Sequence, residues 1–343
     1  MTLKRLFKMM SLALLAAVAI AVATGAVTEQ VARARARREW KVPGKLVDVG
    51  DGRRIQIDCR GSGSPTVVLE SGLDNYGSLA WAAVHDSIAR TTRTCAYSRA
   101  GIMWSDAATG SFDSRNAARD LHAALAASGE SAPWVMVGHS IGAAYVMTYT
   151  QLFAAEVSGV VFVDGSHPDQ FARYREATGK SLEPSATEAR VGAALAWTGL
   201  LRTLPSVPSP ATWPASLGEA STAFLPTSLG ALAEEARAVP ATLARAGEAR
   251  SFGERPLVVL TATAPQAPAD LAAMGLSAEQ GARLQVASRA LHEDQATWSL
   301  RGRNEEVPRA AHYMQFDRAD VVIAAVREVV AKCAASPSGG SHP

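Results

Sequence analysis

The pentapeptide Gly-His-Ser-Ile-Gly at residues 138–142 sets a serine between two glycines. A serine hydroxyl is a weak nucleophile at neutral pH, so it needs a base nearby and a tight turn that exposes its oxygen. A side chain at position 138 or 142 would collide with the neighbouring strand or helix of such a turn. Ser140 is therefore a candidate nucleophile, and the backbone N–H of Ile141 is a candidate oxyanion donor. The alternative is a plain Gly-Ser loop.

The elements around the pentapeptide favour the catalytic interpretation. Residues 134–137 form an apolar run that predicts a buried strand, and residues 143–149 continue as a helix. Strand, sharp turn and helix is the context of a nucleophile elbow. Other strands are predicted at 45–49, 54–59, 65–70, 93–97, 157–163 and 256–260. Because helices separate most of these strands, we expect an α/β fold with a mostly parallel central sheet and helices on both faces.

With these surroundings the pentapeptide resembles the α/β-hydrolase fold family, and more narrowly bacterial serine esterases with an N-terminal hydrophobic segment. The resemblance covers about residues 43–333. It implies a hydrolase core in two parts, residues 45–165 and 254–334, with a helical cap or lid inserted at residues 166–253. Residues 335–343 are small and polar, which indicates a disordered tail.

Two loops depart from the family's pattern. At residues 71–73 the family usually has His-Gly-x, whereas this chain has Ser-Gly-Leu. The resemblance assigns the second oxyanion N–H to Leu73, and a backbone donor survives the change at the first position. Residues 98–105 resemble the family's Asp-Arg-x-Gly-x-Gly-x-Ser loop, with Ser98 in place of Asp and Met103 in place of a glycine. The resemblance implies that this loop supports the elbow.

His312 is the candidate base. A short last strand and its loop are predicted at residues 307–313, and the last helix at residues 320–332. His312 lies in that loop, where the family has its base, in the chain order serine, acid, histidine. His85, His122 and His292 are assigned to helices, and His342 to the tail. His139 is in the elbow and is expected to point away from the nucleophile. His167 follows the candidate acid Asp164 and could line the pocket.

Two carboxylates compete for the role of the acid. Many family members carry it after the strand at residues 256–260, where this chain has no carboxylate before Asp270. In a subset the acid follows the preceding strand, and Asp164 at the end of 157–163 matches that position. We favour Asp164, because the end of an apolar strand holds a side chain more rigidly than the irregular segment before Asp270 does. A buried carboxylate that pairs with a loop amide is the alternative role of Asp164.

These residues predict a serine hydrolase that cleaves carboxylic esters of small molecules through an acyl-enzyme, without a cofactor or a metal ion. A serine nucleophile argues against the dehalogenase and epoxide-hydrolase branches of the family, which use aspartate. Lactone, amide, peptide and thioester cleavage, and acyl transfer to an alcohol, would use the same residues. A hydrolase-fold binding protein without activity is the alternative from another class.

The cap sequence bears on the substrate but is the hardest part to interpret. Its Pro-rich stretch at residues 204–210 cannot form a regular helix, and several short helical pieces are expected around it. Large apolar side chains in this segment either line a wall over the site or only pack the cap onto the core: Trp197, Leu200, Leu201, Trp213 and Phe224.

Charge is distributed unevenly along the 343 residues, which carry a net charge of +2. Residues 1–54 hold 11 Lys/Arg against 4 Asp/Glu, and the remaining residues hold 23 against 28. The folded body is therefore slightly acidic, and nucleic acid is not an expected partner. A fraction of 48% hydrophobic residues suits a globular domain with a large core.

The N-terminal segment at residues 1–44 begins with a membrane signal. Lys4, Arg5 and Lys8 precede an uncharged apolar run at residues 9–27, which is just long enough to span a bilayer. We favour a retained anchor with the body on the extracytoplasmic side. A cleaved signal peptide with Ala-Val-Ala at residues 21–23 as its cleavage site would instead give a secreted or periplasmic protein.

The chain has three cysteines and no C-x-x-C pair that would suggest a metal site. In the resembling fold the strands that carry Cys59 and Cys95 are neighbours, so the resemblance implies that these two thiols can bridge. Cys333 would then stay free. Two small buried core residues are the alternative.

Overall fold

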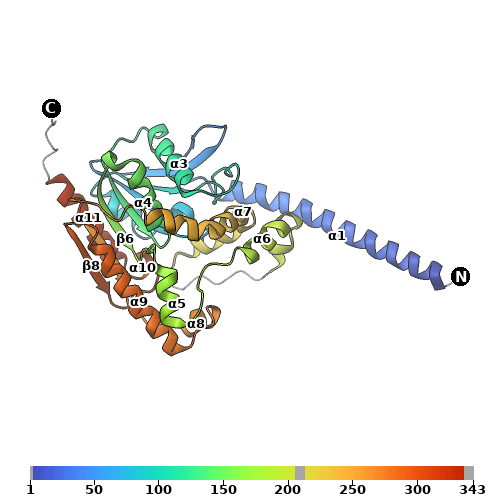
Figure 1. The fold of residues 1–343 in the computed structure, drawn as a ribbon. Helices are drawn as coiled ribbons and strands as arrows, with labels where there is room; N and C mark the ends of the chain where they lie inside the picture. Colours follow the sequence, from blue (N-terminus) through green and yellow to red (C-terminus); the bar gives the residue numbers. More distant parts are fainter. Residues whose placement is uncertain (1–2, 205–212, 336–343) are drawn as a thin grey trace.

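The computed structural model describes residues 3–204 and 213–335, and an eight-stranded sheet forms its centre (Figure 1). The strand order is β1-β2-β4-β3-β5-β6-β7-β8. β2 runs antiparallel to both of its neighbours, and all other neighbouring strands are parallel. The strands are β1 (Lys45–Asp48), β2 (Arg54–Arg60), β3 (Thr66–Glu70), β4 (Thr94–Ser98), β5 (Trp134–His139), β6 (Val157–Val163), β7 (Leu257–Ala262) and β8 (Gly302–Val307).

Helices cover both faces of this sheet, as the alternating pattern predicted. The longer described helices are α1 (Leu3–Glu39), α3 (Ser114–Ala127), α4 (Gly142–Leu152), α5 (Gln170–Thr178), α6 (Ala186–Leu195), α7 (Ala215–Ala246), α9 (Ala278–Ala296) and α11 (Ala319–Ala334). The shorter ones are η1 (Gly77–Trp81), α2 (His85–Ala89), η2 (Ala154–Glu156), η3 (Ala196–Thr198), η4 (Leu200–Thr203), α8 (Pro268–Ala273) and α10 (Met314–Asp317).

Each face of the sheet buries its own apolar core. α3, α4 and the C-terminal part of α7 pack on the face that carries Met136 and Phe162. α2 and α11 pack on the opposite face, which carries Val137 and Val161. Central parallel strands are apolar on both sides for this reason, and β5 is fully buried along its length. The buried strands hold their carboxyl ends firmly at one edge of the sheet.

The segment between β6 and β7 contains α5, α6, η3, η4 and α7, and we call it the cap. The sequence predicted only short helices here, but α7 is 32 residues long and contains Pro226 and Pro240. Proline removes a helical hydrogen bond and usually breaks a helix, so tertiary packing must offset that cost. Phe224 and Leu243 of α7 are buried, which supplies such packing. The predicted Pro-rich stretch beyond Leu204 and the predicted tail beyond Ala335 lie outside the described residues.

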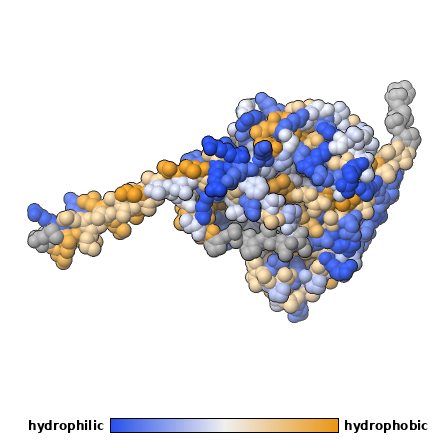
Figure 2. All heavy atoms as spheres, turned by 180° about the vertical axis from the view of Figure 1, so that it is seen from behind, coloured by the Kyte–Doolittle hydropathy of each residue, from blue (hydrophilic) through white to orange (hydrophobic). Residues whose placement is uncertain are grey.

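α1 projects away from the body, with its N-terminal end far from the sheet (Figure 1). Within the described residues it is the one helix long and apolar enough to cross a membrane by length and composition. Figure 2 shows that the projecting part is mostly apolar on its surface.

Cys59 and Cys95 face each other across the antiparallel β2–β4 pair and form a disulfide, as the resemblance implied. Cys333 is a free thiol. The carboxylate of Glu130 lies close to the two sulfurs, but the sulfurs are bonded to each other and Glu130 pairs with Arg93. These three side chains therefore offer no free ligand set for a metal ion.

Candidate active site

Ser140 stands at the turn between β5 and α4, in a left-handed backbone conformation with φ of 55°. The two flanking glycines make that turn possible. A Cβ atom at Gly138 would lie 2.7 Å from the backbone N of Ala143, and one at Gly142 would lie 2.6 Å from the carbonyl O of Glu70. The turn is therefore as tight as the pentapeptide predicted, and the Ser140 side chain remains partly exposed.

The segment after β3 lies directly against Ser140. A Cβ atom at Gly72 would lie 3.1 Å from the Cβ of Ser140, so the backbone that leads into Leu73 passes beside the serine. Ile141 is the N-cap residue of α4, where helix N–H groups lack intrahelical partners. Both predicted oxyanion residues thus flank Ser140, one from the β3 loop and one from the helix start.

Arg99 holds the loop after β3, residues 71–73, through hydrogen bonds to its backbone. Its guanidinium donates to the carbonyl oxygens of Ser71 at 2.8 Å and Gly72 at 2.6 Å. The same group pairs with Glu70 at 2.7 Å and with Glu235 of α7 at 2.8 Å, and all three side chains are at most 3% exposed. Burial raises the pKa of Glu70, against the opposing charge of Arg99. Arg99 belongs to the loop at residues 98–105, which was expected to support the elbow, but its ion cluster with Glu70 and Glu235 was not predicted.

Asp164 and His312 form a short hydrogen bond, with 2.6 Å between the Oδ2 of Asp164 and the Nδ1 of His312. Asp164 follows β6 with φ of 46°, and its Oδ1 accepts from the backbone N of Ala262 at 3.0 Å. Burial alone would lower the pKa of His312, but the hydrogen bond and charge of Asp164 outweigh it, so that pKa is raised. Burial would raise the pKa of Asp164, but the same bond holds it below its usual value.

His292 of α9 supports Asp164 from the other side, which the sequence analysis did not foresee. Its imidazole lies 4.0 Å from the Oδ1 of Asp164 and hydrogen-bonds to the carbonyl of Gly165 and the hydroxyl of Thr261. Burial lowers the pKa of His292. The imidazole of His292 therefore lies beside the Asp164 carboxylate, opposite His312.

Asp270 lies apart from this arrangement, in the exposed first turn of α8. Between the two candidates for the acid, the structure brings Asp164 rather than Asp270 to His312. His167 precedes α5 and is buried, and its Nε2 lies 3.0 Å from the Oδ2 of Asp294 in α9.

His139, which was expected to point away from the nucleophile, contacts the loop that carries the candidate base. Its Nε2 lies 2.9 Å from the carbonyl oxygen of His312, and the two imidazole rings are 4.7 Å apart. Burial, first of all, lowers the pKa of His139 to about 3, so the ring is neutral in ordinary conditions. His139 therefore anchors the loop that carries His312.

Asp74 is a further carboxyl group near Ser140 that the sequence analysis missed. It is 8% exposed, and its Oδ1 accepts from the backbone N of Tyr76 at 2.9 Å. The hydroxyl of Tyr313 lies 3.4 Å from its Oδ2. Burial raises the pKa of Asp74 to about 6. A charge change near Leu73 therefore falls close to neutral pH.

The large apolar residues of the cap have different surroundings. Trp213 stacks on Phe316 and contacts Tyr76 and Tyr313, one residue from His312. Phe224 instead packs the cap onto the core beside Trp104. Trp197 and Leu200 are about half exposed. Trp213, a predicted wall residue, therefore reaches the neighbourhood of His312.

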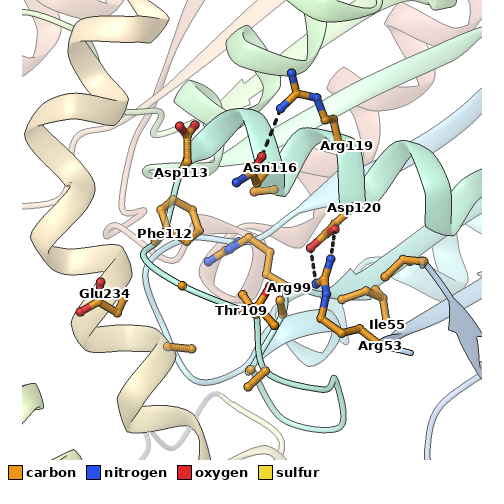
Figure 3. A pocket seen from close by; sticks show the side chains of 18 of the residues that line it. Arg53, Ile55, Arg99, Thr109, Phe112, Asp113, Asn116, Arg119, Asp120 and Glu234 are labelled. Carbon is orange, nitrogen blue, oxygen red and sulfur yellow. Dashed lines mark hydrogen bonds and ion pairs between the residues drawn. The ribbon is translucent and has the colours of Figure 1, made fainter. Parts of the chain in front are cut away.

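A cavity of about 600 Å³ lies on the far side of Arg99, between the 107–113 loop, α3 and α7 (Figure 3). Arg53 and Asp120 form a two-pronged ion pair across one wall. None of Ser140, Asp164 and His312 lines this cavity. The cavity is therefore separate from the candidate catalytic residues.

Comparisons with known sequences point to one fold family. A family model described as the alpha/beta hydrolase fold matches residues 65–208. YbdG of Bacillus subtilis is 26% identical over 137 residues, which are 39% of this chain and 42% of YbdG. The chain spans less than half the length of each curated relative that it matches.

Solved structures give the same result over most of the chain. The esterase EaEST from Exiguobacterium antarcticum has a TM-score of 0.61 at 15% identity, covering 84% of this chain and 99% of the esterase. Est816, described as an N-acyl homoserine lactone degrading enzyme, has a TM-score of 0.58 at 19% identity, covering 83% of this chain and 99% of Est816. At these identities the likeness is one of fold.

Proposed function

We propose that this chain, which has the α/β-hydrolase fold and belongs to the α/β-hydrolase superfamily, is a serine hydrolase of carboxylic esters. Ser140 is the proposed nucleophile, His312 the base and Asp164 the acid. The backbone N–H groups of Leu73 and Ile141 are the proposed oxyanion donors. The superfamily and its esterase neighbours support hydrolysis in general, and the residues of the site support the ester reaction.

The observation that carries the proposal is the 2.6 Å hydrogen bond between Asp164 and His312 beside the Ser140 elbow. A carboxylate on Nδ1 fixes the imidazole tautomer that leaves Nε2 free to accept a proton. The raised pKa of His312 also suits a group that must accept a proton and then return it. The strained left-handed turn at Ser140, which the two glycines make possible, also favours a nucleophile over a protein that only binds ligands.

In the proposed reaction, the Oγ of Ser140 attacks the carbonyl carbon of the ester while its proton passes to the Nε2 of His312. The oxyanion accepts hydrogen bonds from Leu73 and Ile141. His312 then gives the proton to the departing alkoxide, which leaves as an alcohol. Water repeats these steps on the acyl-enzyme, releases the carboxylic acid and restores Ser140.

Ser140→Ala tests the proposal directly. We expect kcat on a small p-nitrophenyl ester to fall by several orders of magnitude, because triad members act as a unit. A fluorophosphonate probe should label the unchanged protein and fail to label this variant. The exposed Ser131→Ala is the matched control and should be labelled normally. Equal labelling or turnover of the Ser140→Ala protein would refute the assignment.

The location of the protein is part of the same proposal. α1 serves as a retained anchor, and the core at residues 45–165 and 254–334 lies with its cap at 166–253 on the extracytoplasmic side. The Cys59–Cys95 disulfide supports this side, because disulfides persist in oxidising compartments. Carbonate extraction of membranes, followed by N-terminal sequencing of the mature chain, distinguishes the anchor from a cleaved signal.

A further inference from the structure

The N-terminal helix has two halves with different surroundings. Residues 3–21 are exposed except for the partly buried Ser11, and they form the projecting apolar part in Figures 1 and 2. From Val22 onward one stripe of the helix is covered by the body. Its covered or partly covered positions recur every three or four residues, which places them on one face: Val22, Gly25, Ala26, Glu29, Ala32, Arg33 and Ala36.

The closest backbone contacts to this face of α1 come from the cap. A Cβ atom at Gly25 would lie 1.9 Å from the carbonyl O of Thr198, and one at Gly199 would lie 2.5 Å from the carbonyl O of Gly25. Close backbone approach through small residues is a common way for helices to pack in membranes. One turn further along, the fully buried Glu29 pairs with Arg202 at 2.7 Å. The η3–η4 segment is therefore held against residues 25–29 of α1.

Large apolar side chains surround this contact without being covered by protein. Four of them lie within five residues of Gly199, and we call them the cap rim: Leu195 at 38% exposure, Trp197 at 52%, Leu200 at 49% and Leu204 at 59%. Such a group on a single short stretch exceeds the scattered apolar exposure expected of a soluble surface. It needs a partner of its own.

The depth of the contact between Gly25 and Thr198 in the bilayer that α1 would cross identifies that partner. Lys8 is the last charge before the apolar run, and a hydrocarbon core of about 30 Å takes about 20 helical residues, which reaches from Met9 to about Thr28. Gly25 then lies roughly 5 Å inside the far boundary of the hydrocarbon. Glu29, the first charge after the run, falls outside it. The cap rim beside Gly25 is thus at the depth where the headgroups meet the acyl chains.

We propose that the cap rim is embedded in the interfacial layer of the bilayer that α1 crosses. Tryptophan is enriched at that depth, and surface-bound elements bury their apolar side chains about 5–10 Å into it. The inference rests on the anchor proposed above and adds a second membrane contact, made by the cap itself. The cap is then held between α1, the lipid surface and the core, and its face toward Ser140 has a fixed orientation relative to the membrane.

Site-specific fluorescence in phosphatidylcholine vesicles tests this with the full chain. In a Cys333→Ser background, single cysteines replace Leu200 on the rim, Leu15 in the free half of α1, or Leu300, and each is labelled with the dye NBD. Leu300 is the matched control, because it is an exposed leucine at 80% on the body, outside the cap. Vesicles with doxyl-labelled acyl chains quench dyes that lie in lipid.

We expect the dyes at positions 15 and 200 to be quenched at least twofold more than the dye at position 300. If position 15 is quenched and position 200 behaves like position 300, the rim contact is refuted while the anchor stands. If neither is quenched, the anchor fails and the rim contact fails with it. A dye at 200 that is shielded from water only at high protein concentration, without lipid quenching, would assign the rim to a second copy and overturn the proposal.

Gly25→Val sharpens the test, because the added side chain must push Thr198 away from α1. The quenching at position 15 should persist and that at position 200 should fall at least twofold. Unchanged quenching at 200 in this variant would show that the contact with α1 does not set the depth of the rim, against the proposal.

Discussion

On the core side, Ser140 and Asp164 stand at the ends of two buried neighbouring strands, whereas on the cap side Trp213 reaches the same neighbourhood from the chain just before α7. The backbone of Asp164 bonds to Leu260 at 2.9 Å, so β7 as well as β6 holds it. Trp213 makes ring contacts with Phe316, Tyr313 and Tyr76. Strand ends give the precision that chemistry needs, and the cap gives a surface that can vary with the substrate.

The largest expected effect concerns the core. We expect Asp164→Asn to lower kcat on a p-nitrophenyl ester by about three to four orders of magnitude, because the imidazole loses its tautomer control and its counter-charge. The control is Asp270→Asn on exposed α8, which should change kcat little. If Asp270→Asn lowered kcat in this way and Asp164→Asn did not, the catalytic acid would not be the residue at the end of β6.

The next effect concerns the buried ion cluster of Arg99, Glu70 and Glu235, which connects the cap to the core. Glu235→Gln removes a buried charge that pairs with Arg99, and we expect the free energy of unfolding to fall by about 2–3 kcal/mol. Denaturant melts measure it. Glu234→Gln, on the same helix but 36% exposed, should stay within about 0.5 kcal/mol of the original chain. Equal losses in both variants would mean that the buried cluster does not join the cap to the core.

A smaller effect is expected on the cap side. Trp213→Ala should raise KM for long-chain esters by about tenfold and leave kcat within about threefold. The ring is partly buried, and the loss of its apolar contacts is worth roughly 1–2 kcal/mol. Trp197→Ala is the control and should leave both constants for a water-soluble ester unchanged, because that ring is half exposed. A kcat collapse in Trp213→Ala would instead assign Trp213 to the positioning of His312.

The smallest effect is on pH dependence. His312 must be neutral to accept a proton, and its pKa is raised, so kcat/KM should increase with pH through a midpoint above 6.5. Half of the His312 side chain is exposed, so solvent moderates the shift. The charge of Asp74 contributes to raising this pKa, and Asp74→Asn should therefore move the midpoint to lower pH. A midpoint that moves upward would contradict this electrostatic role.

The regions differ in the same way in how far the sequence predicts them. Ser140 was predicted as a candidate nucleophile from the pentapeptide and the strand and helix beside it. Asp164 and His312 were assigned from the resemblance to the hydrolase family, and the structure joins these two side chains by a hydrogen bond. Glu70, Arg99 and Glu235 could not be paired from sequence, because two of these partners are 136 residues apart. A charge at the end of the apolar β3 was the available signal, since a buried carboxylate requires a partner.

His292 and α7 show why the rest could not be predicted. His292 meets Asp164 only because α9 packs beside β7, and nothing near either residue in the chain encodes that packing. The prolines of α7 predict breaks, and only burial against the core makes the long helix stable. Both features depend on tertiary contacts, which a reading of local patterns does not contain.

The division of α1 at about Val22 has a consequence for what happens when the chain is cut. The Ala-Val-Ala sequence at residues 21–23 lies at the border between the free half and the covered stripe. A protease that cut after Ala23 would remove the apolar half and leave Gly25, Glu29 and Ala36 still packed on the body. The protein would then have a membrane-anchored form and a released form, and in both the cap would pack against residues 24–39 of α1.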